Sequence, residues 1–121
     1  MERTRFIEHR GRRILLLDYV GIYDPQEALA AVRHSMEVVA AEPPKSLVIL
    51  TDVTSSRYNA EVLQAMKEMA ARNEPHVKVS AVVGVTGLLR IAYQAVMLFS
   101  KRNIRMFPSR PEALDWLVEN S

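Results

Sequence analysis

The chain has 121 residues and a formal net charge of only +2, so charge gives no argument for a nucleic-acid partner. A chain of this length can bury a real core, and we predict a single domain over residues 1–121. It contains no Cys, which excludes a disulfide framework and thiolate chemistry. The first residues lack the apolar stretch of a secretory signal, and the apolar runs are shorter than the ~20 residues that span a bilayer. These features predict a cytoplasmic protein without a transmembrane segment.

Two strands joined by a tight turn open the predicted fold. Residues Thr4–Glu8 and Arg13–Val20 are rich in apolar and branched side chains, which favour strands. The sequence HRGR between them favours a hairpin in which Gly11 takes a positive φ. Arginines beside the turn are typical of an exposed sheet edge, so we expect the first strand to be an edge strand.

A helix is predicted from Asp24 to about Ala41. Asp24 suits the N-cap, Pro25 suits the first turn, and Glu27 follows the cap by three residues. The apolar residues that come next recur at helical spacing, which predicts an amphipathic helix with one buried side.

The stretch Ser46–Thr54, with the sequence SLVILTDVT, predicts the middle strand of the sheet. It is a short, branched, apolar run that ends in an acid and a turn, as expected of a strand buried on both faces. An amphipathic helix is predicted after it, from about Asn59 to Arg72.

The last third of the chain predicts two more strands and two more helices. Strands are expected at Val77–Val85 and Ile104–Phe107, with a helix over Leu88–Arg102 between them. Ser109 and Glu112 have the spacing of a capping box and predict the start of a final helix.

The predicted elements therefore run ββαβαβαβα, which indicates an α/β fold. Crossovers between parallel strands are almost always right-handed, and successive strands are usually neighbours. We expect a mostly parallel five-stranded sheet in sequential order, with an antiparallel first edge strand and helices packed mainly on one face.

The first candidate site is the loop after the central strand. Open α/β sheets place their sites beyond the carboxyl ends of the strands, so we expect an interaction loop there. Asp52 would brace it, and Arg57 and Tyr58 would contact the partner, because Arg and Tyr are common interface anchors. In the alternative, Tyr58 merely covers the neighbouring helix. The loop residues are Asp52, Thr54, Ser55, Ser56, Arg57, Tyr58 and Asn59.

The second candidate site is the predicted helix Leu88–Arg102, whose apolar arc is more than twice the roughly 100° that a surface helix needs. Its core face leaves two apolar flanks uncovered. Neighbouring helices or the C-terminus could cover them. The flanks could also form a self-association face, which makes a homodimer one of the expected states, or a groove for a small apolar ligand or a membrane surface. The flanking residues are Ile91, Tyr93, Met97 and Leu98.

The sequence contains no motif that predicts catalysis, a metal site or a cofactor. None of the four Gly forms a phosphate-binding loop, and the three His have no paired spacing for a metal. A phosphoreceiver domain would need clustered acids and a Lys after the last strand, where this chain has Phe107 and Pro108. No nucleophile and base can be paired, so we predict that the protein is not an enzyme.

Four segments, in this order, resemble a STAS domain, the fold of bacterial anti-sigma-factor antagonists and sulfate-transporter C-terminal domains. GIYD at Gly21–Asp24 is similar to the family's G-x-L-D before its first helix. VILTDV is similar to the central strand that ends in Asp, VVGVT to the next strand-to-helix joint, and IRMFPSRPEAL to the terminal strand and helix. The resemblance covers nearly the whole chain and implies a regulatory, protein-binding role.

One departure from the family concerns its regulatory serine. STAS antagonists open the second helix with D-S-S-G, which carries a phosphorylatable Ser, whereas this chain has NAEV at Asn59–Val62. Ser55 and Ser56 lie upstream, so that serine has no counterpart. Glu61 either mimics a permanent negative charge or complements the helix dipole.

The chain looks closer to small stand-alone SpoIIAA-like proteins, which are often grouped with CRAL-TRIO lipid-binding domains because of similar winding. That grouping implies a small apolar ligand. The first hypothesis is therefore a non-enzymatic interaction or regulatory module that binds a protein partner or itself. The alternative is a carrier or sensor of a small apolar ligand or lipid, held between the sheet and the helix Leu88–Arg102.

Overall fold

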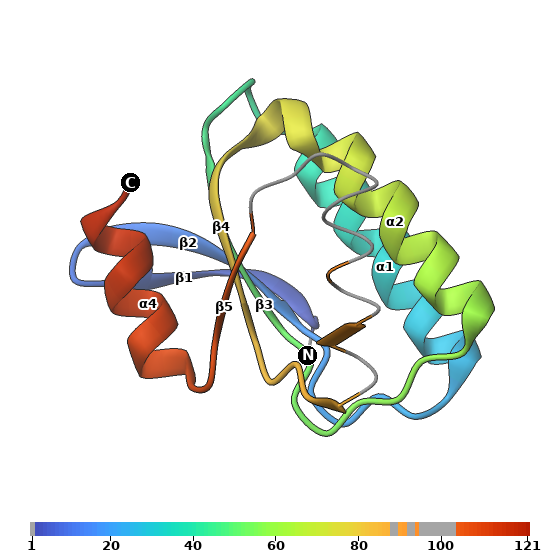
Figure 1. Ribbon diagram of the computed structural model, residues 1–121. Helices are drawn as coiled ribbons and strands as arrows, with labels where there is room; N and C mark the ends of the chain where they lie inside the picture. Colours follow the sequence, from blue (N-terminus) through green and yellow to red (C-terminus); the bar gives the residue numbers. More distant parts are fainter. Residues whose placement is uncertain (1, 88–89, 92–93, 95–103) are drawn as a thin grey trace.

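The computed structural model describes residues 2–87, 90–91, 94 and 104–121. Its centre is a five-stranded sheet in which the strands follow one another in chain order, β1-β2-β3-β4-β5 (Figure 1). β1 is antiparallel to β2, and the remaining neighbours are parallel, which confirms the predicted α/β sheet. The strands are β1 (Thr4–His9), β2 (Arg12–Asp18), β3 (Leu47–Asp52), β4 (Val77–Val83) and β5 (Arg105–Phe107).

The turn between β1 and β2 consists of Arg10 and Gly11, whose φ angles are 52° and 79°. His9 and Arg12 pair directly across it. Two successive positive φ angles are those of a type I′ turn, whose twist matches the twist of the strands that it joins. Gly11 adopts this conformation without a steric cost, as the sequence predicted.

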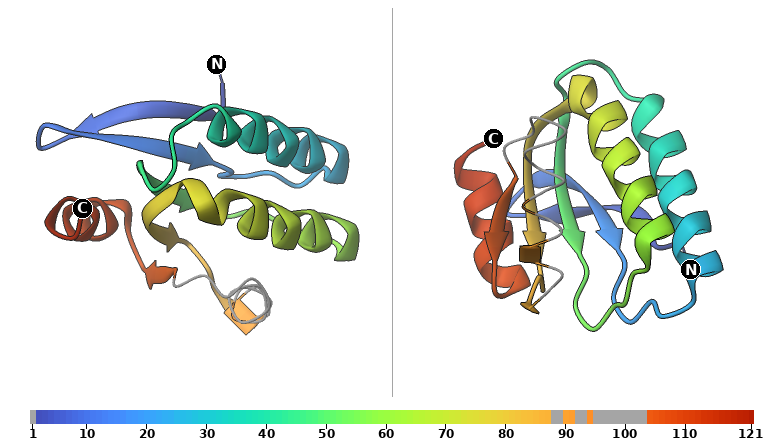
Figure 2. Two further views of the ribbon diagram at one scale, coloured as in Figure 1. Left: turned by 90° about the horizontal axis from the view of Figure 1, so that it is seen from above. Right: turned by 45° about the vertical axis from the view of Figure 1, so that its right-hand side comes forward.

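Helices cover both faces of the sheet. α1 (Pro25–Ala40) and α2 (Ala60–Asn73) lie side by side on one face, and α4 (Arg110–Glu119) lies on the other (Figure 2). A short 3₁₀ turn, η1 (Glu74–His76), leads from α2 into β4. The sequence predicted that the helices pack mainly on one face of the sheet. Among the described helices, α1 and α2 do share one face, and α4 packs on the opposite face.

The inner strands require cover on both faces because their side chains are apolar on both. In β2, Leu15 and Leu17 face the core under α1 and α2, while Ile14 and Leu16 face the core under α4. All four are buried, with at most 1% of each residue exposed. Two hydrophobic cores therefore share one sheet, and burial of both is the main stabilising contribution.

The helix starts agree with the sequence in two of three cases. Asp24 Oδ1 accepts a hydrogen bond from the Gln26 N–H at 3.2 Å, and Asn59 Oδ1 accepts one from the Val62 N–H at 2.8 Å. Ser109 occupies the N-cap position of α4, but its side chain makes no capping hydrogen bond. The predicted capping box is therefore wrong in its chemistry, and the first turn of α4 is held by Arg110 instead.

Most of the helix predicted at Leu88–Arg102 lies outside the described residues. Of this region, Gly87, Arg90, Ile91 and Gln94 are helical. Within the described ranges, no helix is both long enough and apolar enough to span a membrane.

Candidate functional site

The carboxyl ends of β2 and β3 meet at one edge of the sheet, at the bottom of Figure 1, where residues 19–24 and 52–59 follow them. We call these two segments the loop surface. Backbone hydrogen bonds join them: the Gly21 N–H donates to Thr54 O at 3.0 Å, and the Arg57 N–H donates to Ile22 O at 2.8 Å. The loop predicted as an interaction site is thus one half of a two-loop surface.

Asp52 fixes the start of the second loop. Its side chain is only 5% exposed. Oδ1 accepts hydrogen bonds from the backbone N–H of Thr54 at 3.0 Å and from the Thr54 hydroxyl at 2.6 Å. These bonds hold the chain in a tight turn directly after β3.

The other oxygen of Asp52 binds Arg110, in the first turn of α4. Arg110 Nε donates to Asp52 Oδ2 at 2.5 Å, and Arg110 Nη2 lies 3.2 Å from Asp18 Oδ1. Asp18 and Asp52 are register partners at the ends of β2 and β3, so the guanidinium lies between two carboxylates. Arg5 Nη2, 3.2 Å from Asp18 Oδ2, completes the charge cluster.

Electrostatics in this cluster favour the charged forms. Burial alone would lower the pKa of Arg110, but its hydrogen bond to Asp52 and the two carboxylate charges outweigh burial and raise it. Burial likewise favours a higher pKa for Asp18, but the Val20 N–H and the Arg5 guanidinium outweigh that effect and lower it. Asp18 and Arg110 therefore stabilise each other's charged form.

Sequence reasoning missed Arg110, which is 58 positions from Asp52. One signal was available. A cation in the first turn of a helix opposes the helix dipole, and such a position indicates that the side chain has another partner.

Tight packing shapes the same edge of the sheet. Gly84 follows β4 with a φ of 85°, and a Cβ on it would lie 2.3 Å from Thr54 Oγ1. Ser55 has a positive φ of 57°, and the Ser56 hydroxyl donates to Val53 O at 2.5 Å. The loop therefore has a defined conformation with no room for a larger residue at Gly84.

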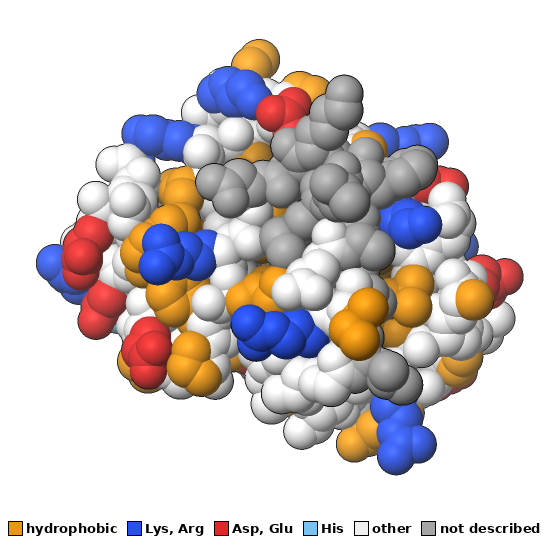
Figure 3. Space-filling model, in the orientation of Figure 1, with side chains coloured by type: hydrophobic (Ala, Val, Ile, Leu, Met, Phe, Trp, Pro, Cys, Tyr) orange, Lys and Arg blue, Asp and Glu red, His pale blue; other side chains and the backbone are white. Residues whose placement is uncertain are grey.

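The loop surface presents both polar and apolar side chains. Thr54, Ser55, Arg57 and Asn59 are exposed, and the Arg57 guanidinium carbon lies 5.7 Å from the centre of the Tyr23 ring. Tyr23 is itself 59% exposed. On the face seen in Figure 3, hydrophobic and basic side chains are interspersed toward the lower edge.

Tyr58 is placed differently from the other residues of the predicted loop. Its ring is half-buried against the core under α1 and α2, and burial raises the pKa of its hydroxyl to about 12. Among the described residues, that buried hydroxyl has no hydrogen-bond partner. Tyr23, which the sequence did not single out, supplies the exposed aromatic ring instead.

The predicted apolar helix can be examined at one position. Ile91 is 63% exposed. Tyr93, Met97 and Leu98 lie outside the described residues, so the predictions on them stay predictions.

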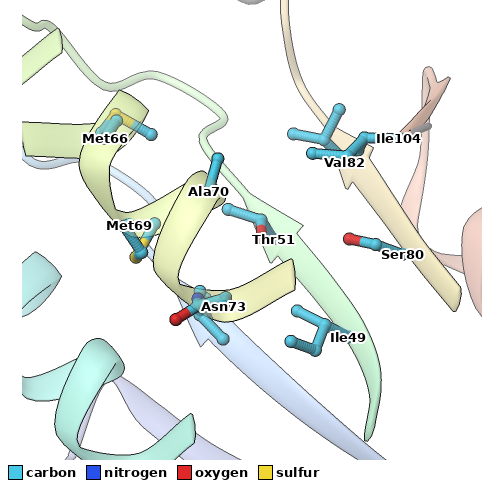
Figure 4. A pocket seen from close by; sticks show the side chains of 10 residues that line it. Ile49, Thr51, Met66, Met69, Ala70, Asn73, Ser80, Val82 and Ile104 are labelled. Atoms are coloured by element: carbon cyan, nitrogen blue, oxygen red, sulfur yellow. The ribbon is translucent and has the colours of Figure 1, made fainter. Parts of the chain in front are cut away.

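A small cavity lies between α2 and the sheet (Figure 4). Its volume is about 30 Å³. One ordered water needs roughly 10–15 Å³ by this measure, so the space corresponds to about two waters. The walls consist of Leu17, Ile49, Thr51, Met66, Met69, Ala70, Asn73, Ser80, Val82 and Ile104.

The part of the chain that the structure describes holds no cluster of three or more His, Cys, Asp or Glu that could bind a metal ion. At the paired acids Asp18 and Asp52, the Arg110 guanidinium lies where a cation would bind.

No protein-family model matches the chain, and no curated protein matches it. A solved structure does: an uncharacterised protein of the DUF3478 family with a SpoIIAA-like fold, from Shewanella loihica PV-4. The two share 15% sequence identity, with a TM-score of 0.72 over 94% of this chain and 91% of that one. The chain therefore has a SpoIIAA-like fold, as the sequence resemblance implied; at this identity the likeness shows the fold alone.

Proposed function

We propose that this SpoIIAA-like domain is a non-enzymatic interaction module that binds a protein partner through the loop surface. One observation carries the proposal. The large hydrophobic side chains that are exposed in the described part of the chain are Val20, Tyr23 and Ile91, at 36%, 59% and 63%. Val20 and Tyr23 belong to the loop surface, directly after β2, whereas Ile91 lies outside it, in the helical segment after β4.

The chemistry of the loop surface supports a protein partner. Tyr and Arg are enriched among the residues that dominate binding energy at protein interfaces, and here Tyr23 and Arg57 lie together. The loop that carries Arg57 is held by Asp52 and by backbone bonds to its neighbour. A surface that is ordered before binding loses less conformational entropy on association.

The start of α2 offers no hydroxyl for phosphorylation, which supports binding that is not switched by phosphate at this position. Asn59 Oδ1 caps the helix by accepting from the Val62 N–H, and Ala60 and Glu61 carry no hydroxyl. Binding through the loop surface would therefore depend on partner concentration rather than on phosphate at the start of α2.

A photo-crosslinking amino acid at Tyr23 tests the proposal, with the same amino acid at the exposed Arg33 of α1 as the control. We expect position 23, and not position 33, to crosslink one specific protein in cells that express the chain. The purified partner should bind the wild type in calorimetry, lose affinity for Arg57→Glu, and bind Arg33→Glu normally. Crosslinking to another copy of the chain would identify a homodimer. Equal crosslinking at both positions would contradict the proposal.

The cavity favours a second candidate function, carriage or sensing of a small apolar ligand. Most of its wall residues are apolar, and it lies between α2 and the sheet. The sequence analysis placed the ligand between the sheet and the predicted helix Leu88–Arg102, so the cavity supports the class of ligand and not that location. Native mass spectrometry of the purified chain beside a denatured control tests this reading. A ligand mass present only in the native spectrum would support it, and two identical masses would contradict it.

A further inference from the structure

We propose that the cavity between α2 and the sheet binds the neutral hydrogen-bonding group of a small molecule, a hydroxyl or a carboxamide, with a short apolar body attached. The inference deepens the second candidate function by naming the class of ligand. It does not depend on the loop surface, which lies on other residues.

Polar side chains at three of the wall positions carry the inference. Asn73 and Ser80 are buried, at 2% and 4% exposure, and Thr51 is half-buried. The structure shows no hydrogen bond from any of these side chains to another described residue, and Asn73 does not cap η1. Among the described residues, the buried side-chain polar atom without a partner is the Tyr58 hydroxyl, so the polar atoms of Thr51, Asn73 and Ser80 are not fully shielded. Polar groups inside proteins are normally hydrogen-bonded, and these three line a cavity whose occupant can bond to them.

The three groups come from elements that face one another across the cavity. Thr51 lies on β3 and Ser80 on β4, two neighbouring strands, whereas Asn73 is the last residue of α2. In Figure 4 the Thr51 and Ser80 side chains lie on the sheet side of the cavity, opposite Met66, Met69 and Ala70 of α2. Two hydroxyls and an amide can both donate to and accept from one small polar group.

The walls favour a neutral group over an ion. The described wall residues include no Asp, Glu, Lys, Arg or His. A carboxylate or ammonium group buried there would have no opposite charge, and burying an unpaired ion costs far more than burying a hydrogen-bonded neutral group.

The size of the cavity limits the enclosed group. About 30 Å³ corresponds to roughly two waters, which is the size of a hydroxyl or carboxamide group with its first carbon. Met66 and Met69 form the opposite wall, and unbranched methionine side chains adapt their shape to a neighbouring apolar group. Water would fill the cavity when no ligand is bound.

The methionine methyl groups give a direct readout of binding. In the full chain labelled with ¹³C-methyl methionine, we would titrate 1-butanol, butyramide, butyrate and xenon and follow the Met66 and Met69 resonances. We expect butanol and butyramide to shift these resonances to saturation, and butyrate and xenon to leave them nearly unchanged.

Removal of one hydroxyl tests the hydrogen bonds. Ser80→Ala should weaken butanol and butyramide binding about fivefold, since a neutral hydrogen bond contributes about 1 kcal/mol. Thr51→Val, which keeps the side-chain shape, is the second variant should Ser80→Ala alter the fold. Ser46→Ala is the control, because the Ser46 hydroxyl bonds Pro43 O at 2.7 Å and does not line the cavity.

Four results would overturn the inference. Butyrate that binds as tightly as butyramide would show that the cavity does not select a neutral group. Xenon that binds in preference to butanol would show a dry apolar cavity. Methionine resonances unmoved by every probe would show that the cavity takes no ligand. A long-chain ligand found by native mass spectrometry, with no butanol effect, would support the carrier function and reject this ligand class.

Discussion

Asp52 is the residue that joins the candidate site to the rest of the fold. One oxygen holds Thr54 in the loop, and the other accepts from Arg110 in α4, which lies on the opposite face of the sheet from α1 and α2. A buried carboxylate is tolerated only when its hydrogen-bonding capacity is satisfied, and here two separate elements satisfy it. Loss of either partner therefore affects a loop and a helix together.

A double-mutant cycle on Asp52 and Arg110 should show strong coupling. The variants are Asp52→Asn, Arg110→Met and the double variant, each unfolded with urea. We expect a coupling free energy of about 1–3 kcal/mol, because the two side chains contact each other and the carboxylate is buried. Strictly additive single effects would show that the pair does not connect the loop to α4.

A second ion pair of α4, with a residue of the turn between β1 and β2, provides the control. Arg10 Nη1 lies 3.6 Å from Asp115 Oδ1, and both side chains are more than half exposed. Solvent screens such a pair, so the same cycle on Arg10→Met and Asp115→Asn should show much weaker coupling than the cycle on Asp52 and Arg110.

Asp18 predicts a specific loss of stability in acid. Its pKa in the folded chain lies below the ordinary value of 3.8 because the Val20 N–H, Arg5 and Arg110 outweigh the effect of burial. A carboxyl group with a lowered folded pKa stabilises the fold above its unfolded pKa, and this stabilisation is lost as pH falls through the folded pKa. The free energy of unfolding of the wild type should therefore fall more steeply below pH 3.8 than that of Asp18→Asn. Parallel pH profiles from urea unfolding would contradict this assignment.

At the scale of elements, the three N-cap residues differ in whether the side chain makes a capping hydrogen bond. Asp24 and Asn59 accept hydrogen bonds from the first turns of α1 and α2, whereas the Ser109 side chain does not cap α4. We expect Asp24→Ala and Asn59→Ala each to lower the free energy of unfolding by about 1 kcal/mol. Ser109→Ala should change it by less than about 0.5 kcal/mol, as substitutions away from such features do. Thermal and urea unfolding measure all three, and an equal loss for Ser109→Ala would show that it caps α4 in solution.

At the scale of the whole molecule, local sequence signals predicted the elements and their order. The Asp24-Pro25 helix start, the Gly11 turn and the apolar run of β3 each act over a few residues, and the structure contains all three. The sequential strand order then follows from short right-handed connections. These features depend on neighbours along the chain, which a single sequence displays.

Features that depend on long-range contacts were not predictable in the same way. The Asp52–Arg110 contact spans 58 positions, and nothing near either residue indicates the other. Ile14 and Leu16 are apolar and point to the second face of the sheet, so some helix must pack on that face. The sequence of β2 does not specify which helix does so, and the position of α4 could not be predicted from it. The polar wall of the cavity likewise joins Asn73 to two strands, and only the folded chain brings them together.

The two cores share the same strands, and this predicts how the molecule unfolds. Met66 of α2 lies in the core under α1 and α2, and Leu117 of α4 lies in the core on the opposite face. Because each strand has side chains in both cores, loss of either core exposes an apolar face of the whole sheet. Met66→Ala and Leu117→Ala should each lower the free energy of unfolding by about 2–5 kcal/mol in one cooperative transition.

The single Trp of the chain makes this cooperativity measurable. Trp116 lies on α4 and contacts Phe107, so its fluorescence reports on the α4 face, while far-ultraviolet circular dichroism reports on all helices. Met66→Ala changes the core on the face opposite Trp116. It should nevertheless lower the urea midpoint measured by fluorescence as much as the midpoint measured by dichroism, because the two cores share the same strands and unfold together. A fluorescence midpoint that stays at the wild-type value while the dichroism midpoint falls would show that α4 and its core unfold separately. In that case the Asp52–Arg110 contact would break before the rest of the fold, and the loop surface would not depend on α4.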